Sequence, residues 1–124
     1  MSIRYEYNNE IDKNCLQALF LSVNWKVGNI PDKLQEAFRH SHRVISAWEK
    51  EELIGLINSI ADGVLNVYIP YILVKPNYQK QGLGKHLVGR ILKEYESYER
   101  IVLLTDKDEI DFYIKCGFNP KFLI

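Results

Sequence analysis

The chain has 124 residues, of which 47% are hydrophobic and 26% charged, and these values predict one globular domain over residues 1–124. Sixteen basic residues balance sixteen acidic ones, and this zero net charge argues against a nucleic-acid partner bound by bulk electrostatics. No apolar run approaches the roughly 20 residues of a membrane-spanning helix, and segment 1–10 is too polar for a secretory signal. We therefore expect a cytoplasmic protein with no membrane partner.

Two cysteines, Cys15 and Cys116, stand far apart in the sequence and lack the spacing of metal ligands. They predict a reducing setting, without a disulfide framework and without a metal site.

The chain alternates between strand and helix patterns in its first half. Apolar residues at every second position predict a strand over residues 3–7. Helical spacing predicts a helix over 11–23 and a second helix that begins at Pro31. Apolar segments 44–48 and 53–60 flank a charged turn and predict a hairpin.

The second half begins with a turn signal, Asp62-Gly63, before a long apolar strand over 64–74. Pro70 interrupts this strand, and because proline cannot donate a ladder hydrogen bond, we expect a bulge or a splayed edge there. A turn and a helix over 82–95 follow, and then a strand over 101–104.

The last part of the chain predicts a helix and a short strand. Asp106 is expected to cap this helix, Gly117 to end it, and Phe118 to begin the strand. The complete order is strand, two helices, three strands, helix, strand, helix and short strand, which is typical of a mixed α/β domain.

A glycine-containing loop is the clearest functional motif. Residues 79–85 read Gln-Lys-Gln-Gly-Leu-Gly-Lys between a predicted strand and a predicted helix. A helix start presents unpaired N–H groups that bind phosphate, and no acidic residue occurs from 64 to 92, so we expect an anionic ligand. Lys80 replaces the first glycine of a P-loop, and Leu87 replaces the third glycine of a dinucleotide fingerprint, which excludes both motifs.

Two separated motifs resemble the GCN5-related N-acetyltransferases (GNAT). The first is Val-x-Pro-x-Tyr-Gln-x-x-Gly-x-Gly at 74–84, and the second is Phe-Tyr-Ile-Lys-Cys-Gly-Phe at 112–118. The resemblance implies a three-layer α/β fold with a mostly antiparallel central sheet that splays after Pro70. It also implies transfer of an acetyl group from acetyl-CoA to a small-molecule or peptide amine.

The resemblance also implies roles for individual residues. Tyr113 would be the general acid that protonates the departing thiolate, and the Ile72 amide would bind the acetyl oxygen. The implied cofactor-binding residues are Ile72, Leu73, Val74, Gln79, Lys80, Gln81, Gly82, Leu83, Gly84, Lys85 and Asp106. Trp25 and Trp48 are expected in the core or on a pocket wall.

The general base stays open at this point. Tyr68 and Pro70 stand where family members often carry Glu or His. A strand carboxylate would not be needed if water or a residue from another element accepted the proton, or if the acceptor amine had a low pKa.

The alternative function is a weak or inactive acyl-CoA sensor. The chain ends six residues after Phe118, which predicts an open sheet edge and a homodimer as one consequence.

Overall fold

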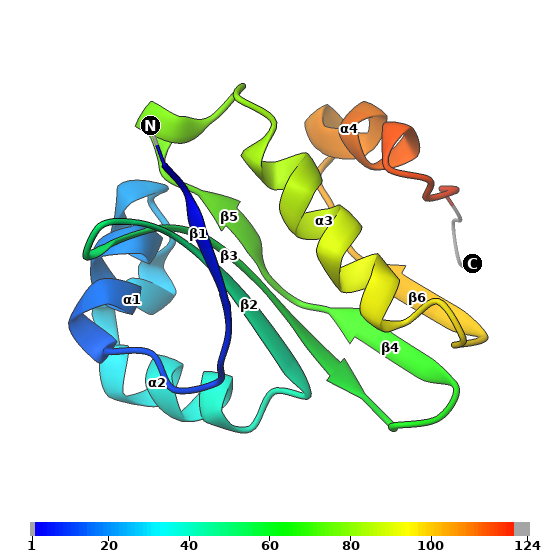
Figure 1. Ribbon diagram of the computed structural model, residues 1–124, viewed down its shortest axis with the longest axis horizontal. Helices are drawn as coiled ribbons and strands as arrows, with labels where there is room; N and C mark the ends of the chain where they lie inside the picture. Colours follow the sequence, from blue (N-terminus) through cyan, green and yellow to red (C-terminus); the bar gives the residue numbers. More distant parts are fainter. Residues whose placement is uncertain (1, 121–124) are drawn as a thin grey trace.

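A computed structural model describes residues 2–120 of the protein. Figure 1 shows a twisted sheet with helices on both of its faces. The six strands are β1 (Arg4–Tyr7), β2 (Arg43–Glu49), β3 (Glu52–Ala61), β4 (Asn66–Ile69), β5 (Ile72–Val74) and β6 (Arg100–Leu103). The α-helices are α1 (Lys13–Ser22), α2 (Pro31–Arg39), α3 (Leu83–Glu94) and α4 (Ile110–Lys115), with short 3-10 helices at Lys26–Asn29, Pro76–Tyr78 and Lys107–Glu109.

The strands form one mixed sheet in the order β1-β2-β3-β4-β6, and β5 also pairs with β3. All pairs are antiparallel except β4 with β6, which are parallel and joined through α3. This arrangement confirms the predicted mixed, mostly antiparallel sheet. For most helices and strands, the predicted ends differ from the observed ends by one or two residues.

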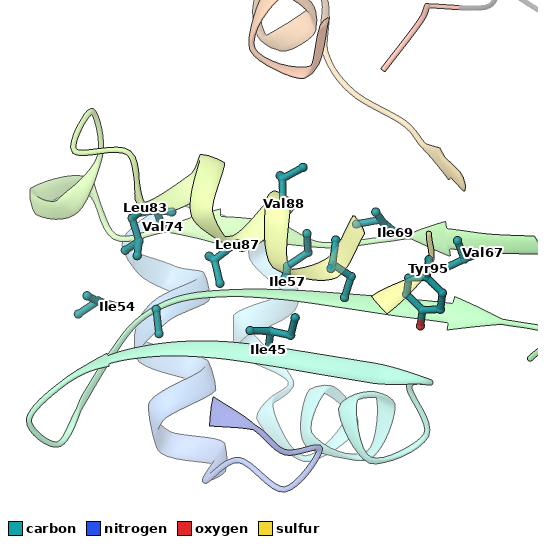
Figure 2. Packing of buried hydrophobic residues seen from close by; sticks show 12 residues of the cluster. Ile45, Ile54, Ile57, Val67, Ile69, Val74, Leu83, Leu87, Val88 and Tyr95 are labelled. Atoms are coloured by element: carbon teal, nitrogen blue, oxygen red, sulfur yellow. The ribbon is translucent and has the colours of Figure 1, made fainter. Parts of the chain in front are cut away.

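Two hydrophobic clusters fill the two faces of the sheet. Apolar side chains of α1 and α2 cover one face, and those of α3 cover the other. Along β2 the clusters alternate, with Val44 in one and Ile45 in the other, because successive strand residues point to opposite faces. Figure 2 shows the second cluster, with Leu87 of α3 beside Ile57 and Ile45 of the sheet.

The predicted interruption at Pro70 divides the long strand into β4 and β5. Ile57 of β3 pairs with Ile72, and Ile60 of β3 pairs with Tyr68. Between these two pairs β3 has two residues, whereas the opposite segment has three. One extra residue on one strand is a β-bulge, which bends that strand. Before the bulge β4 pairs with β6; after it β5 pairs with β3 and, among residues 2–120, with no other strand. A gap therefore opens between β5 and β6.

The end of α4 is fixed by Gly117, as predicted. Gly117 has a φ of +106°, and its N–H donates to the Ile114 carbonyl at 3.0 Å. The N–H of Phe118 donates to the Tyr113 carbonyl at 3.0 Å, which completes a Schellman motif. The rings of Tyr113 and Phe118 pack with centroids 6.1 Å apart.

Three other expectations have different outcomes. The Asp106 side chain makes no capping hydrogen bond within the described residues; its main-chain carbonyl accepts from the Glu109 N–H at 3.0 Å and closes the following 3-10 turn. Residues 118–120 are not in a strand, and the rest of the predicted final strand lies outside the described residues. No helix within residues 2–120 is long and apolar enough to cross a membrane.

Candidate functional site

A cavity of about 790 Å³ lies where β5 and β6 separate. Both layers of helices contribute to its wall, since residues near the end of α1 lie on one side and residues of α4 on the other. Its lining includes most of the predicted site residues: Ile72, Leu73, Val74, Gln79, Lys80, Gly82, Gly84, Lys85, Asp106 and Tyr113. Gln81 and Leu83 do not line it: the Gln81 side chain donates to the Asn77 carbonyl at 3.2 Å, and the Leu83 side chain is buried in the core.

The glycine loop presents the start of α3 to this cavity. Gly82 precedes the helix with a φ of +82°, and Lys80 also has a positive φ, of +65°. No described side chain caps the helix, so its first N–H groups are open to an external acceptor. With Lys80 and Lys85 on the cavity wall, this donor set fits the phosphate groups of an anionic ligand.

Two contacts hold the loop in place. The Gln79 side-chain amide donates to the Val74 carbonyl at the end of β5, at 2.9 Å. A Cβ atom on Gly84 would lie 3.4 Å from the Phe112 ring, an ordinary van der Waals distance, so α4 lies close beside the start of α3. Packing alone therefore does not require glycine at position 84.

The β5 main chain is the third part of the cavity wall. Asn58 N–H donates to the Tyr71 carbonyl at 3.1 Å, and Lys75 N–H donates to the Ile54 carbonyl at 2.8 Å. Main-chain groups alternate in direction along an antiparallel strand, so those of Leu73 point toward β3 and those of Ile72 point into the gap. Of the three predicted β5 residues, Ile72 and Val74 thus have N–H groups that point away from β3, and Ile72 lies nearer to the bulge.

Tyr113 stands on the opposite wall, on α4. Its side chain is half-buried and packs against Phe112, with ring centroids 5.0 Å apart. Burial, and to a smaller degree the charges of Glu109 and Cys116, raises the pKa of the Tyr113 phenol to about 12. The phenol is therefore protonated and can donate a hydrogen bond at neutral pH.

Trp25 lies at the end of the cavity nearest α1 and packs against other aromatic residues. The Trp25 ring lies 5.6 Å from the Tyr71 ring and 5.8 Å from the Phe20 ring, measured between centroids. Trp25 is 38% exposed and lines the cavity with Val23 and Pro70. Trp48 lies instead beside Arg4 and donates to the Ser46 hydroxyl at 2.8 Å, away from the cavity.

Sequence reasoning did not identify Glu109 as a cavity residue. Asp106 and Glu109 are the two carboxylates on the cavity wall within the described part of the chain. Glu109 precedes Tyr113 by four residues, so the two lie one helical turn apart. This four-residue spacing to Tyr113 was the signal that the sequence offered for Glu109.

A second hollow, of about 840 Å³, lies between α1 and the β2–β3 turn. Cys15, Lys75 and the acidic turn residues line it, and Lys75 is paired there with Glu52 at 2.9 Å. It contains neither the glycine loop nor Tyr113. The candidate site is therefore the cavity between β5 and β6.

The opened mixed sheet, the uncapped helix beside the gap and the tyrosine across from it define an acyl-CoA N-acyltransferase fold. The protein-family model described as "Acetyltransferase (GNAT) family" matches residues 9–118 of the sequence, and the chain belongs to this family.

Relatives and solved structures agree with this assignment. An uncharacterized N-acetyltransferase, ycf52, of Gracilaria tenuistipitata var. liui is 30% identical to the chain, over 95% of this chain and 68% of that protein. Histone acetyltransferase TAP1 of Glycine max is also 30% identical, over 94% of this chain and 56% of that protein. The chain thus spans about half to two thirds of these relatives. A GNAT-family acetyltransferase of Streptococcus pneumoniae superposes with a TM-score of 0.84 at 25% identity, covering 95% of this chain and 88% of that one.

Proposed function

We propose that the chain binds acetyl-CoA in the cavity between β5 and β6 and transfers the acetyl group directly to a primary amine in a ternary complex. The observation that carries the proposal is that one cavity joins three groups: the open N–H groups of α3, the outward N–H of Ile72, and the Tyr113 phenol. These groups match the three needs of the reaction, which are phosphate binding, stabilisation of an oxyanion and protonation of a thiolate.

In this proposal each residue has one task. Lys80, Lys85 and the start of α3 hold the diphosphate, and the Ile72 N–H donates to the acetyl oxygen. Glu109 accepts a proton from the acceptor ammonium, which leaves a neutral amine. The amine nitrogen forms a bond to the acetyl carbon, and the carbon–sulfur bond breaks. Tyr113 gives its proton to the departing sulfur and regains one from the nitrogen of the new amide.

The pKa of Tyr113, about 12, affects how this last step proceeds. A thiol has an ordinary pKa of about 8.5, so a phenol of higher pKa does not transfer its proton completely to a thiolate on its own. The proton transfer becomes favourable when Tyr113 regains a proton from the nitrogen of the new amide at the same time. Tyr113 is therefore proposed to act in concert with the loss of that proton.

Ligand binding can be tested by thermal shift. Acetyl-CoA should raise the melting temperature, because it binds only the folded state, whereas ATP and NAD should raise it less. Lys85→Gln should weaken acetyl-CoA binding by about tenfold, since it removes a charge-assisted contact. Lys93→Gln is the matched control, because it makes the same change at the far end of α3. A larger shift with ATP or NAD than with acetyl-CoA would contradict the proposal.

Turnover separates the enzyme from the acyl-CoA sensor. Thiol release should be measured with polyamines, aminoglycosides, amino acids and peptides as acceptors. Release above the rate of acetyl-CoA hydrolysis with at least one amine supports the enzyme. Binding of acetyl-CoA without release to any of these acceptors favours the sensor.

The homodimer and the cytoplasmic location remain parts of the proposal. The homodimer is motivated by β6, whose outer edge pairs with no strand among residues 2–120. Sedimentation at several protein concentrations tests the homodimer, and a monomer at every concentration would contradict it.

The cytoplasmic location is tested by imaging a tagged chain; one relative, GCN5-related N-acetyltransferase 2 of Arabidopsis thaliana, is named chloroplastic.

A further inference from the structure

Asn58 makes an unusual set of contacts at the bulge between β4 and β5. It lies on β3 and is only 3% exposed. Its main-chain N–H donates to the Tyr71 carbonyl at 3.1 Å, and its side-chain Oδ1 accepts from the Tyr71 N–H, also at 3.1 Å. Its Nδ2 donates to the Ser41 hydroxyl at 3.0 Å. Asn58 therefore binds both main-chain groups of Tyr71, one with its backbone and one with its side chain.

In a regular antiparallel pair, the Tyr71 N–H would donate to the Asn58 main-chain carbonyl. Here the carboxamide oxygen replaces that carbonyl. This substitution lets the strand bend at the bulge while the Tyr71 N–H keeps a hydrogen bond. Pro70, just before Tyr71, has no N–H that needs a partner. The Asn58 carboxamide therefore satisfies the Tyr71 N–H, and Pro70 leaves no N–H to be satisfied before it.

The bend determines where the next residue lies. The register between β3 and β5 directs the Ile72 N–H away from β3 and into the cavity. The hydrogen bonds between Asn58 and Tyr71 hold the start of this strand in place. Without the carboxamide, the Tyr71 N–H would need either water or the Asn58 carbonyl. Pairing with that carbonyl would leave the direction of the Ile72 N–H unchanged, but it would shift the strand segment that carries Ile72.

We propose that Asn58 is a positioning residue for acetyl transfer: its carboxamide fixes the strand bend that places the outward-pointing Ile72 N–H at the acetyl oxygen. This inference rests on the function proposed above. Asn58 does not line the cavity, so it acts only through Tyr71 and Ile72.

Ser41 provides a matched control for the loss of buried hydrogen bonds. Its hydroxyl accepts from Asn58 and donates to the Ala37 carbonyl at 3.1 Å, at the end of α2. Ser41→Ala therefore disturbs the same buried network but leaves both Asn58–Tyr71 hydrogen bonds in place. A merely structural role of Asn58 predicts the same kinetic change for Ser41→Ala and for variants of Asn58.

The experiment compares wild type with Asn58→Leu, Asn58→Ala, Asn58→Asp and Ser41→Ala. Hydrogen exchange by NMR reports the Tyr71 and Ile72 amides without any ligand. We expect exchange at Tyr71 to accelerate at least tenfold in Asn58→Leu, or in Asn58→Ala should the leucine variant not fold, and to change less in Ser41→Ala. Asn58→Asp, which keeps an oxygen in place for the Tyr71 N–H, should restore most of the protection.

Kinetics with acetyl-CoA and an accepted amine test the consequence. Loss of the carboxamide should lower kcat at least tenfold relative to Ser41→Ala, because small misplacements at a reacting centre can cost about 10²-fold. The KM for the amine should change less than kcat. Equal kcat values in Asn58→Ala and Ser41→Ala, or unchanged exchange at Tyr71 in Asn58→Ala, would overturn the inference. If the wild type binds no acetyl-CoA, the proposed function and the positioning role fail together, whereas exchange at Tyr71 still decides whether Asn58 fixes the bend.

Discussion

Tyr113 is the residue on which the chemistry of the cavity depends most. Burial raises the pKa of its phenol to about 12, so the hydroxyl carries its proton at any pH at which the protein would work. The ring packs edge-to-face against the rings of Phe112 and Phe118, and the phenylalanine variant keeps this ring. Removing the hydroxyl therefore tests proton donation without disturbing the packing.

Tyr113→Phe should lower kcat by about 10²–10⁴-fold, the usual size of general acid catalysis. The affinity for acetyl-CoA should stay within about twofold, which calorimetry can measure. Tyr98→Phe is a suitable control, because it removes a phenol hydroxyl outside the cavity. If Tyr113→Phe turns over within about twofold of wild type while chemistry limits the rate, Tyr113 is only part of the cavity wall.

Glu109 provides the second residue-scale prediction. Glu109→Gln should lower kcat by about 10²-fold or more for strongly basic amines, because these need a proton acceptor. An amine of low pKa should be affected far less, since most of it is already neutral. Asp108→Asn, which changes a neighbouring exposed carboxylate outside the cavity, should leave both rates unchanged. An equal loss with both kinds of amine would argue against proton transfer to Glu109.

At the scale of elements, two glycines of the helices have opposite roles. Gly89 lies on the exposed side of α3, and a Cβ atom there would meet nothing within 4 Å. Gly117 ends α4 with a φ of +106°, a conformation that other residues rarely adopt. The first glycine only lowers helix stability, whereas the second is required by the backbone.

Gly89→Ala should therefore stabilise the protein by about 0.5–1 kcal/mol, because alanine has the higher helix propensity. Gly117→Ala should destabilise it by about 1–3 kcal/mol, the cost of a strained backbone conformation. Urea unfolding of both variants measures the two free energies. A loss of stability in Gly89→Ala would mean that an unrecognised contact covers this side of α3.

At the scale of the whole molecule, burial is uneven across the sheet. α3 places Leu83, Leu87, Val88 and Ile91 in the core, whereas α4 contributes no fully buried residue among those described. β6 likewise has only half-buried and exposed residues. The wall of the cavity that carries Tyr113 thus rests on fewer buried contacts than the wall formed by α3.

Hydrogen exchange should reveal this difference. In the free protein, amides of 110–117 should exchange faster than those of 83–94, because local opening costs less where few apolar contacts are lost. Saturating acetyl-CoA should slow exchange most in 110–117, since in the proposed complex it contacts both walls. Uniform protection of the two segments in the free protein would contradict this reading of the burial pattern.

Much of the fold follows from local patterns in the sequence. Alternating residues determine the faces of β2, and helical spacing determines the buried side of α3. Pro70 predicts the bend because it lacks an N–H, and Gly117 predicts the end of α4 because it tolerates a positive φ. Each of these signals acts over a few residues, which is why sequence alone could determine them.

Only the tertiary structure decided which distant groups meet. Asn58 contacts Tyr71 because the register between β3 and β5 places the two residues opposite each other at the edge of the bulge, and no local pattern marks an asparagine for that contact. Glu109 reaches the cavity because α4 packs across the gap from β5, a placement set by contacts between elements. The loop motif and Tyr113 could be recognised in the sequence. The contact between Asn58 and Tyr71 and the place of Glu109 on the cavity wall depend on long-range packing, which a local pattern does not encode.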